Sequence, residues 1–169
     1  LTHTGQMFRI GMYHDNHPDG HYEMANKVIA FEPHPRTHQF LEKNVGDLPN
    51  VTTVQAAVAE QEGTAELYDY LMMSASGSLH YDESIADLQR AQMGEFDVAP
   101  RKDGEFQMQK YAVKTIPIDK CLMEMGIQQV DFVKMDIEGA EMGALRSMKQ
   151  TISNSPNLSL IMEYNPQAL

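Results

Sequence analysis

The stretch VIAFEPHP, residues 28–35, decides the fold prediction. Four apolar residues suited to a buried strand end on the carboxylate of Glu32, and prolines then stand on either side of His34. Proline suits the first turn of a helix, so Pro35 predicts a helix that carries Phe40 and other apolar residues on one side. The stretch therefore predicts a strand followed directly by a helix.

Beyond this stretch, apolar runs of strand length alternate with helical patterns along the chain. We predict strands at residues 28–31, 51–58, 64–70, 111–118, 130–137 and 158–164, and helices from residue 35, over 84–93, over 119–125 and from about 139. The half-polar alternation of residues 64–70 favours an antiparallel or edge strand. Strands buried on both faces and separated by helices indicate an α/β fold with an open, mostly parallel sheet and flanking helices.

Residues 72–111 are the least periodic part of the chain. We interpret them as an insertion or substrate-side lid, because loops of this kind often carry substrate contacts. The length of 169 residues, 42% of them hydrophobic, fits one domain over residues 1–169.

Charge and cysteine content narrow the class of protein. The formal net charge of −11 argues against nucleic acid or an anionic membrane as partner, because both are bound through basic surfaces. No apolar run approaches the roughly 20 residues of a membrane span. The single cysteine, Cys121, cannot form an internal disulfide and suits a reducing compartment, so we expect a cytoplasmic protein.

Glu32 is the first candidate site residue. In an open α/β sheet, ligands bind outside the carboxyl ends of the strands, where an acid can accept hydrogen bonds from both hydroxyls of a nucleotide ribose. The alternative is that Glu32 caps the following helix and favours its dipole. The pattern alone leaves both interpretations open.

The stretch KMDIEGAE, residues 134–141, holds a second set of acids. Asp136 ends another predicted buried strand, and Glu138 and Glu141 follow three residues apart, so they share a face if the helix begins that early. Acids in the first turn of a helix are also stabilising without any catalytic role. We interpret Gly139 as allowing close packing of helix against sheet.

Histidines supply two further candidates. His14, His17 and His21 are spaced like metal ligands, but no cysteine or compact acid set completes a site, so we interpret them as a polar loop between a first helix and strand 28–31 and expect no metal. His80 lies in the presumed substrate region, where a neutral imidazole could take a proton from a hydroxyl. A plain surface histidine is the alternative.

Four stretches together carry a resemblance: VIAFEPHP, NVTTVQAAVAEQEGTAELY at residues 50–68, SASGSLH at 74–80 and VDFVKMDIEGAEMGALRSM at 130–148. In this order they resemble the FkbM family of S-adenosylmethionine-dependent methyltransferases. The DxEGxE element at residues 136–141 is the most specific piece, and FEP at 31–33 is the second.

The resemblance implies a Rossmann-like class I methyltransferase fold that binds S-adenosylmethionine and methylates a hydroxyl of a small molecule or sugar. It implies that Glu32 binds the cofactor ribose, that Ala56 and Ala57 lie near the adenine, and that Asp136 lies near the methionine end. THTGQMF, residues 2–8, resembles the second half of the family's glycine-rich turn, with His3 where asparagine is usual and Gly5 as the later glycine.

The first strand of such a fold and its earlier glycine have no counterpart, and residues 158–164 resemble the fifth strand. We therefore expect a fragment that lacks the first strand and the C-terminal strands. The expected chemistry is in-line displacement at the cofactor's sulfonium, for which the protein aligns the nucleophile and excludes water. Any general base would come from Asp136, Glu138 or His80.

Two other functions remain open. An NAD-dependent oxidoreductase also places an acid after a strand, but the surviving turn shows no GxGxxG. A non-catalytic binding domain could keep the fold without the chemistry.

Overall fold

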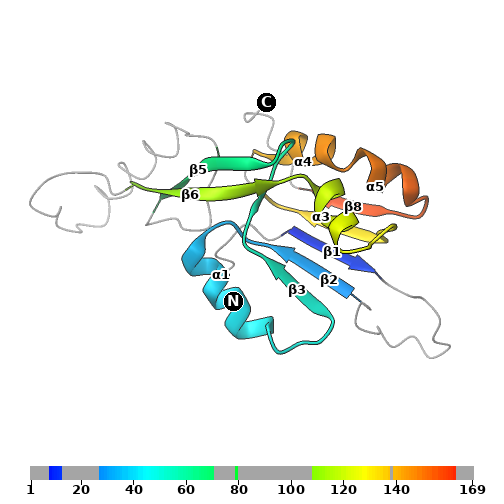
Figure 1. The fold of residues 1–169 in the computed structure, drawn as a ribbon, viewed down its shortest axis with the longest axis horizontal. Helices are drawn as coiled ribbons and strands as arrows, with labels where there is room; N and C mark the ends of the chain where they lie inside the picture. The colour runs from blue at the N-terminus through cyan, green and yellow to red at the C-terminus, as the bar shows by residue number, and fades with distance from the viewer. Residues whose placement is uncertain (1–7, 13–26, 71–78, 80–107, 138, 163–169) are drawn as a thin grey trace, which may run out of the picture.

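A computed structural model describes residues 8–12, 27–70, 79, 108–137 and 139–162 of the chain (Figure 1). Within these ranges it is an α/β structure with two sheets. The elements in chain order are β1 (Phe8–Met12), β2 (Lys27–Phe31), α1 (Pro35–Val45), β3 (Val51–Val54), β4 (Ala57–Val58), β5 (Gly63–Tyr70), β6 (Met108–Ile116), α3 (Ile118–Glu124), β7 (Phe132–Met135), α4 (Glu141–Ser147), α5 (Lys149–Asn154) and β8 (Ser159–Met162).

The larger sheet has five strands in the order β3-β2-β1-β7-β8. β2 pairs with β3 in parallel and β7 pairs with β8 in parallel, but β1 is antiparallel to both β2 and β7. β2, β3, β7 and β8 therefore point the same way and the central strand points against them. The sheet is mixed, whereas the strand pattern predicted a mostly parallel one.

The segment Phe8–Met12 corrects one expectation. The sequence pattern placed a helix before His14, but these residues form β1, which lies between β2 and β7. The physical reason is that both neighbouring strands expose backbone N–H and C=O groups toward this gap, and a fifth strand satisfies them. Phe8, Ile10 and Met12 also alternate with period two, as a strand requires.

The smaller sheet has three strands in the order β4-β6-β5. β5 and β6 pair antiparallel over eight residues, from Gly63 opposite Thr115 to Tyr70 opposite Met108. The prediction that residues 64–70 form an antiparallel or edge strand is confirmed. The predicted strand 51–58 divides between the two sheets, because β3 belongs to the large sheet and β4 to the small one.

The core lies between the larger sheet and the helices α3 and α4. Ile29 and Phe31 of β2 and Val133 and Met135 of β7 are at most 2% exposed and belong to one cluster with apolar residues of these helices. Figure 1 shows α3, α4 and α5 gathered on one side of the sheet, with α1 beside β2 and β3. The helix predicted from about residue 139 begins at Glu141 and is divided at Met148 into α4 and α5.

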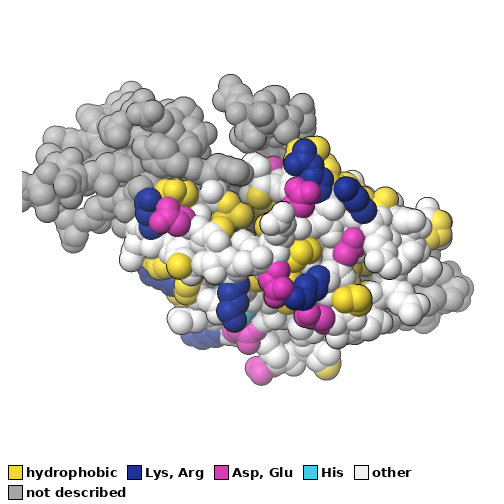
Figure 2. Space-filling model, turned by 45° about the horizontal axis from the view of Figure 1, so that its top comes forward, with side chains coloured by type: hydrophobic (Ala, Val, Ile, Leu, Met, Phe, Trp, Pro, Cys, Tyr) yellow, Lys and Arg dark blue, Asp and Glu magenta, His cyan; other side chains and the backbone are white. Residues whose placement is uncertain are grey.

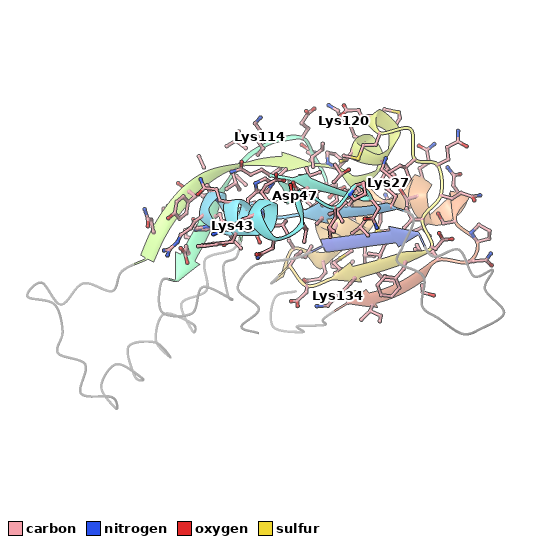
Figure 3. The ribbon with its side chains drawn as sticks, turned by 90° about the horizontal axis from the view of Figure 1, so that it is seen from below. Lys27, Lys43, Asp47, Lys114, Lys120 and Lys134 are labelled. Carbon is pink, nitrogen blue, oxygen red and sulfur yellow. The ribbon has the colours of Figure 1, made fainter. Side chains whose placement is uncertain are left out.

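The other face of β7 carries Phe132 and Lys134, which are both partly exposed. Lys134 alternates with the buried Val133 and Met135, and it lies on the side of the sheet away from Lys120 of α3 (Figure 3). Figure 2 shows that lysines and arginines lie beside acids on the face it presents. Among the described residues, ion pairs join Lys110 to Glu66 at 3.0 Å, Arg146 to Glu60 at 3.7 Å, and Lys120 to Glu62. No described helix is long and apolar enough to cross a membrane.

Candidate active site

The candidate site lies at the carboxyl ends of β2 and β7, on the two sides of β1. Both strands run antiparallel to β1, so Glu32 after β2 and Asp136 after β7 follow strand ends at the same edge of the sheet. Phe8, where β1 begins, pairs with Phe31 at this edge. The topology therefore brings together two of the predicted acids that are 104 residues apart in sequence.

Glu32 is buried, with 3% of its surface exposed. Its backbone N–H donates to the carbonyl of Val54 at 3.0 Å, which extends the pairing of β2 with β3 by one residue. Its carboxyl oxygen Oε1 accepts a hydrogen bond from the backbone N–H of His34 at 2.8 Å. Burial raises the pKa of Glu32 to about 8, and the hydrogen bond from His34 opposes this shift only in part. Because burial disfavours the ionised form, a ligand that donates hydrogen bonds to the Glu32 carboxylate would stabilise that form and lower its pKa.

His34, and not Glu32, caps helix α1. His34 is the residue before the helix, and its Nδ1 accepts a hydrogen bond from the backbone N–H of Thr37 at 3.3 Å. Pro35 occupies the first turn, as predicted. The capping role that was the alternative for Glu32 is therefore filled by its neighbour.

Ala56 and Ala57 line a small apolar cavity at the same edge of the sheet. Both residues are buried, and the backbone N–H of Ala56 donates to the carbonyl of Val54 at 3.0 Å. The segments that follow β2, β3 and β7 meet at this cavity. Its lining consists of Phe31, Pro33, Ala56, Ala57, Val58, Leu79, Ile137 and Ala140. The immediate neighbours of Glu32 and Asp136 thus meet the predicted adenine-side alanines around one cavity.

Asp136 itself is more open than Glu32. Its side chain is 38% exposed, and its Oδ2 lies 3.4 Å from the Nζ of Lys134. Ile137, the next residue, is buried and lines the cavity, so the carboxylate of Asp136 belongs to the more polar side of the strand end. An accessible carboxylate beside a cavity can bind a cation or accept a proton.

Glu141 has a role that sequence analysis did not identify. It is 7% exposed, and its Oε1 accepts hydrogen bonds from the backbone N–H groups of Ile137 at 3.3 Å and Gly139 at 3.2 Å. The Glu141 carboxylate thus points back onto the loop that follows β7. The sequence spacing had instead suggested that Glu141 shares a helix face with Glu138. Gly139 has a φ of 95°, which only glycine adopts readily, so the backbone of this turn by itself favours glycine here.

The sequence pattern also indicated no functional role for His34 or Asp69. In the structure, Nε2 of His34 lies 3.1 Å from Oδ2 of Asp69. The prolines around His34 marked a helix start, and that was the available signal for its cap. Nothing local signals Asp69, because it lies in a half-polar strand 35 residues further along the chain.

Four predicted site residues lie outside the described residues: His3, Gly5, His80 and Glu138. The histidines 14, 17 and 21 and most of the proposed insertion, 72–111, lie outside them too. Among the residues that the structure describes, no three side chains of histidine, cysteine, aspartate or glutamate converge to hold a metal ion.

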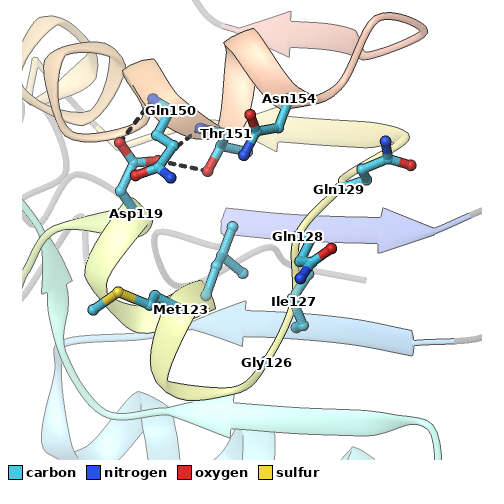
Figure 4. A pocket seen from close by; sticks show the side chains of 10 residues that line it. Asp119, Met123, Gly126, Ile127, Gln128, Gln129, Gln150, Thr151 and Asn154 are labelled. Carbon is cyan, nitrogen blue, oxygen red and sulfur yellow. Dashed lines mark hydrogen bonds between the residues drawn. The ribbon is translucent and has the colours of Figure 1, made fainter.

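A larger hollow of about 510 Å³ lies elsewhere, between α3 and α5 (Figure 4). Residues Gly126 to Gln129, which precede β7, form one wall, so the hollow lies at the opposite end of that strand from Asp136. Asp119 on its rim accepts hydrogen bonds from the backbone N–H groups of Gln150 and Thr151 at 2.9 and 2.8 Å, which caps α5. None of the predicted site residues that the structure describes lines this hollow.

Comparisons with known proteins bear on the site at the ends of β2 and β7. A family model described as the methyltransferase FkbM domain matches residues 10–168. The 2-O-methyltransferase NoeI of Sinorhizobium fredii is 24% identical over an alignment of 149 residues that covers 85% of this chain and 55% of that protein. The chain therefore spans about half the length of this relative. No solved structure matches the chain.

Proposed function

The chain belongs to the FkbM family of methyltransferases, and from this premise we propose that it transfers a methyl group from S-adenosylmethionine to a hydroxyl of a small molecule or sugar. The relative NoeI is a 2-O-methyltransferase, which supports oxygen as the acceptor atom. The fold we propose for the complete domain is the Rossmann-like class I methyltransferase fold.

The observation that carries the cofactor proposal is the buried carboxyl of Glu32 at the end of β2. Among the described residues its carboxyl group has one hydrogen bond, from the His34 N–H, and no cation within reach. A ribose diol would supply two more donors to this carboxylate and so offset the cost of its burial. Glu32 therefore holds the ribose in our proposal.

The other site residues take roles around the same cavity. Ala56 and Ala57 flank the adenine with small apolar side chains, His3 and Gly5 belong to the turn that approaches the cofactor, and Asp136 lies toward its methionine end. Of the three candidates for the general base, Asp136 is the one among the described residues. Its carboxylate is 38% exposed and could accept a proton from the substrate hydroxyl. Glu138 and His80 remain candidates for the same role.

The cofactor supplies an electrophilic methyl group on a sulfonium, which needs little help from the protein. The base, which would be Asp136, Glu138 or His80, would take the proton of the acceptor hydroxyl as this oxygen is methylated, and S-adenosylhomocysteine would be the second product. The residues of the chain hold the two reactants in line and keep water from the methyl carbon.

Calorimetric titration of the chain with S-adenosylhomocysteine tests the proposal, with NADH titrated in parallel. We expect binding of S-adenosylhomocysteine and not of NADH, and we expect Glu32→Ala to weaken it roughly 10- to 100-fold, as for lost hydrogen bonds to a charged group. Glu66→Ala is the matched control, because Glu66 lies exposed on β5 and pairs with Lys110 of β6. Binding of NADH alone would favour an oxidoreductase, and cofactor binding without methylation of any acceptor would favour a binding domain.

A further inference from the structure

His34 connects the loop of Glu32 to the smaller sheet. Its Nε2 lies 3.1 Å from Oδ2 of Asp69 on β5, and the two side chains are only 13% and 8% exposed. Tyr111 of β6 packs against the same ring edge-on, with centroids 4.5 Å apart and planes at 67°. Two strands of the smaller sheet, β5 and β6, thus hold the ring of His34, which lies just before helix α1.

The hydrogen bonds assign the tautomer of His34. Its Nδ1 accepts from the backbone N–H of Thr37 and therefore carries a lone pair and no proton. The neutral ring then carries its proton on Nε2, which donates to the carboxylate of Asp69. Both ring nitrogens are engaged, so His34 is not placed to take a proton from a substrate.

The backbone of His34 carries this restraint to Glu32. Its N–H donates to Oε1 of Glu32 at 2.8 Å, so the direction of the carboxyl depends on where this N–H points. Pro33 and Pro35 on either side have fixed φ angles and leave the segment few other conformations. Fixing the ring of His34 therefore also fixes the carboxyl of Glu32.

We propose that Asp69 is a positioning residue for cofactor binding, acting through His34 on Glu32. The proposal rests on the proposed function, because it assumes that Glu32 binds the ribose of S-adenosylmethionine. Asp69 touches neither cofactor nor acceptor; it holds the His34 ring so that the buried carboxyl of Glu32 is presented in the orientation that the ribose requires. Because Asp69 lies on β5, this link adds a second strand of the smaller sheet to the cofactor site, to which β4 already contributes Ala57.

Two substitutions of Asp69 and one of His34 test this link. Asp69→Ala removes the acceptor for Nε2–H, and we expect it to weaken binding of S-adenosylhomocysteine about tenfold in calorimetric titration. Asp69→Asn keeps an acceptor oxygen, so its affinity should stay close to that of the wild type. His34→Asn keeps a side chain that caps helices well but is too short to reach Asp69, so it should behave like Asp69→Ala.

Nitrogen-15 spectra of the imidazole groups supply a readout that a loss of stability alone would not change. The His34 signal, identified by its absence in His34→Asn, should report the Nε2–H tautomer in the wild type and in Asp69→Asn. In Asp69→Ala the Nε2–H should exchange faster with water, because its buried acceptor is gone. Glu66→Ala on the same strand is the control and should change neither affinity nor spectrum.

The outcomes separate the two proposals. Failure of the wild type to bind S-adenosylhomocysteine would overturn the proposed function, and the role of Asp69 in cofactor binding with it. Wild-type binding that Asp69→Ala leaves unchanged would overturn only the role of Asp69. A folded Asp69→Asn variant that binds as poorly as Asp69→Ala would also contradict it, since the acceptor would then not be what matters.

Discussion

The carboxylate of Glu141 accepts a hydrogen bond from the backbone N–H of Gly139, two residues before it, at 3.2 Å. The same oxygen accepts from the N–H of Ile137 at 3.3 Å. These N–H groups lie between the end of β7 and the start of α4, where neither strand nor helix provides a partner. Glu141 thus shapes the loop of the DxEGxE element from inside.

We expect Glu141→Ala to lower the free energy of unfolding by about 1–3 kcal/mol, because it leaves two N–H groups in a partly buried loop without their acceptor. Glu141→Gln keeps one acceptor oxygen and should cost less. Urea denaturation measures both. Glu124→Ala on the exposed side of α3 is the control and should stay within about 0.5 kcal/mol of the wild type. Equal stability of Glu141→Ala and the control would refute this role.

Two glycines close together in sequence should respond to alanine with opposite signs. Gly139 has a φ of 95°, so Gly139→Ala should cost about 1–2 kcal/mol in unfolding free energy. Gly143 lies inside helix α4, and a Cβ there would meet its nearest neighbour, the backbone nitrogen of Glu60, at an ordinary 3.8 Å. Gly143→Ala should therefore stabilise the chain by roughly 0.5–1 kcal/mol. Thermal unfolding of both variants would show the contrast, and a loss of stability in Gly143→Ala would contradict it.

The raised pKa of Glu32 makes stability depend on pH. Folding raises this pKa from 4.5 to about 8, so between these values the folded chain keeps a proton that the unfolded chain releases. The contribution of Glu32 to stability is therefore fully present below pH 4.5 and falls as pH rises to about 8, by up to about 1.4 kcal/mol per pH unit.

Glu32→Gln removes this dependence. Relative to the wild type it should become steadily more stable from pH 5 to pH 8, as urea denaturation at several pH values would measure. Glu66→Gln is the control: the hydrogen bond from Lys110 lowers the pKa of exposed Glu66, so its contribution is lost toward low pH instead. A constant difference between Glu32→Gln and the wild type over this range would show that Glu32 is ionised in the folded chain.

Asp119 should stabilise α5 from outside that helix. Besides two backbone N–H groups, its Oδ1 accepts from the hydroxyl of Thr151 at 2.6 Å (Figure 4). We expect Asp119→Ala to cost about 1–2 kcal/mol, as for the loss of a good helix cap, and Asp119→Asn to cost less. Gln150→Ala removes a side chain but keeps the backbone donor, so chemical denaturation should find it unchanged; a comparable loss there would rule out the capping explanation.

Local patterns were enough for the elements that the core depends on. The continuous apolar runs at residues 28–31 and 130–137 predicted β2 and β7, and the half-polar alternation of 64–70 predicted the antiparallel β5. The two prolines near His34 predicted the start of α1 to the residue. Each of these signals is contained in a few consecutive residues, which is why it can be recognised without neighbours.

The wrong predictions concern elements whose conformation depends on the strands next to them in the fold. Phe8–Met12 forms a strand because β2 and β7 both lack a partner in the gap between them, and no property of the five residues alone requires this. The break between β3 and β4 likewise follows from each strand joining a different sheet.

The sequence pattern was sufficient to predict that an acid follows each of two buried strands, and therefore that Glu32 and Asp136 lie at one edge of a sheet. The different environments of the two acids can be seen only in the folded chain, where Glu32 is 3% exposed with a pKa of about 8 and Asp136 remains 38% exposed beside Lys134. The physical reason is that desolvation of a carboxyl depends on every atom packed around it, including those of residues far away in the chain. For the same reason the contact of His34 with Asp69 exists only once the smaller sheet is in place.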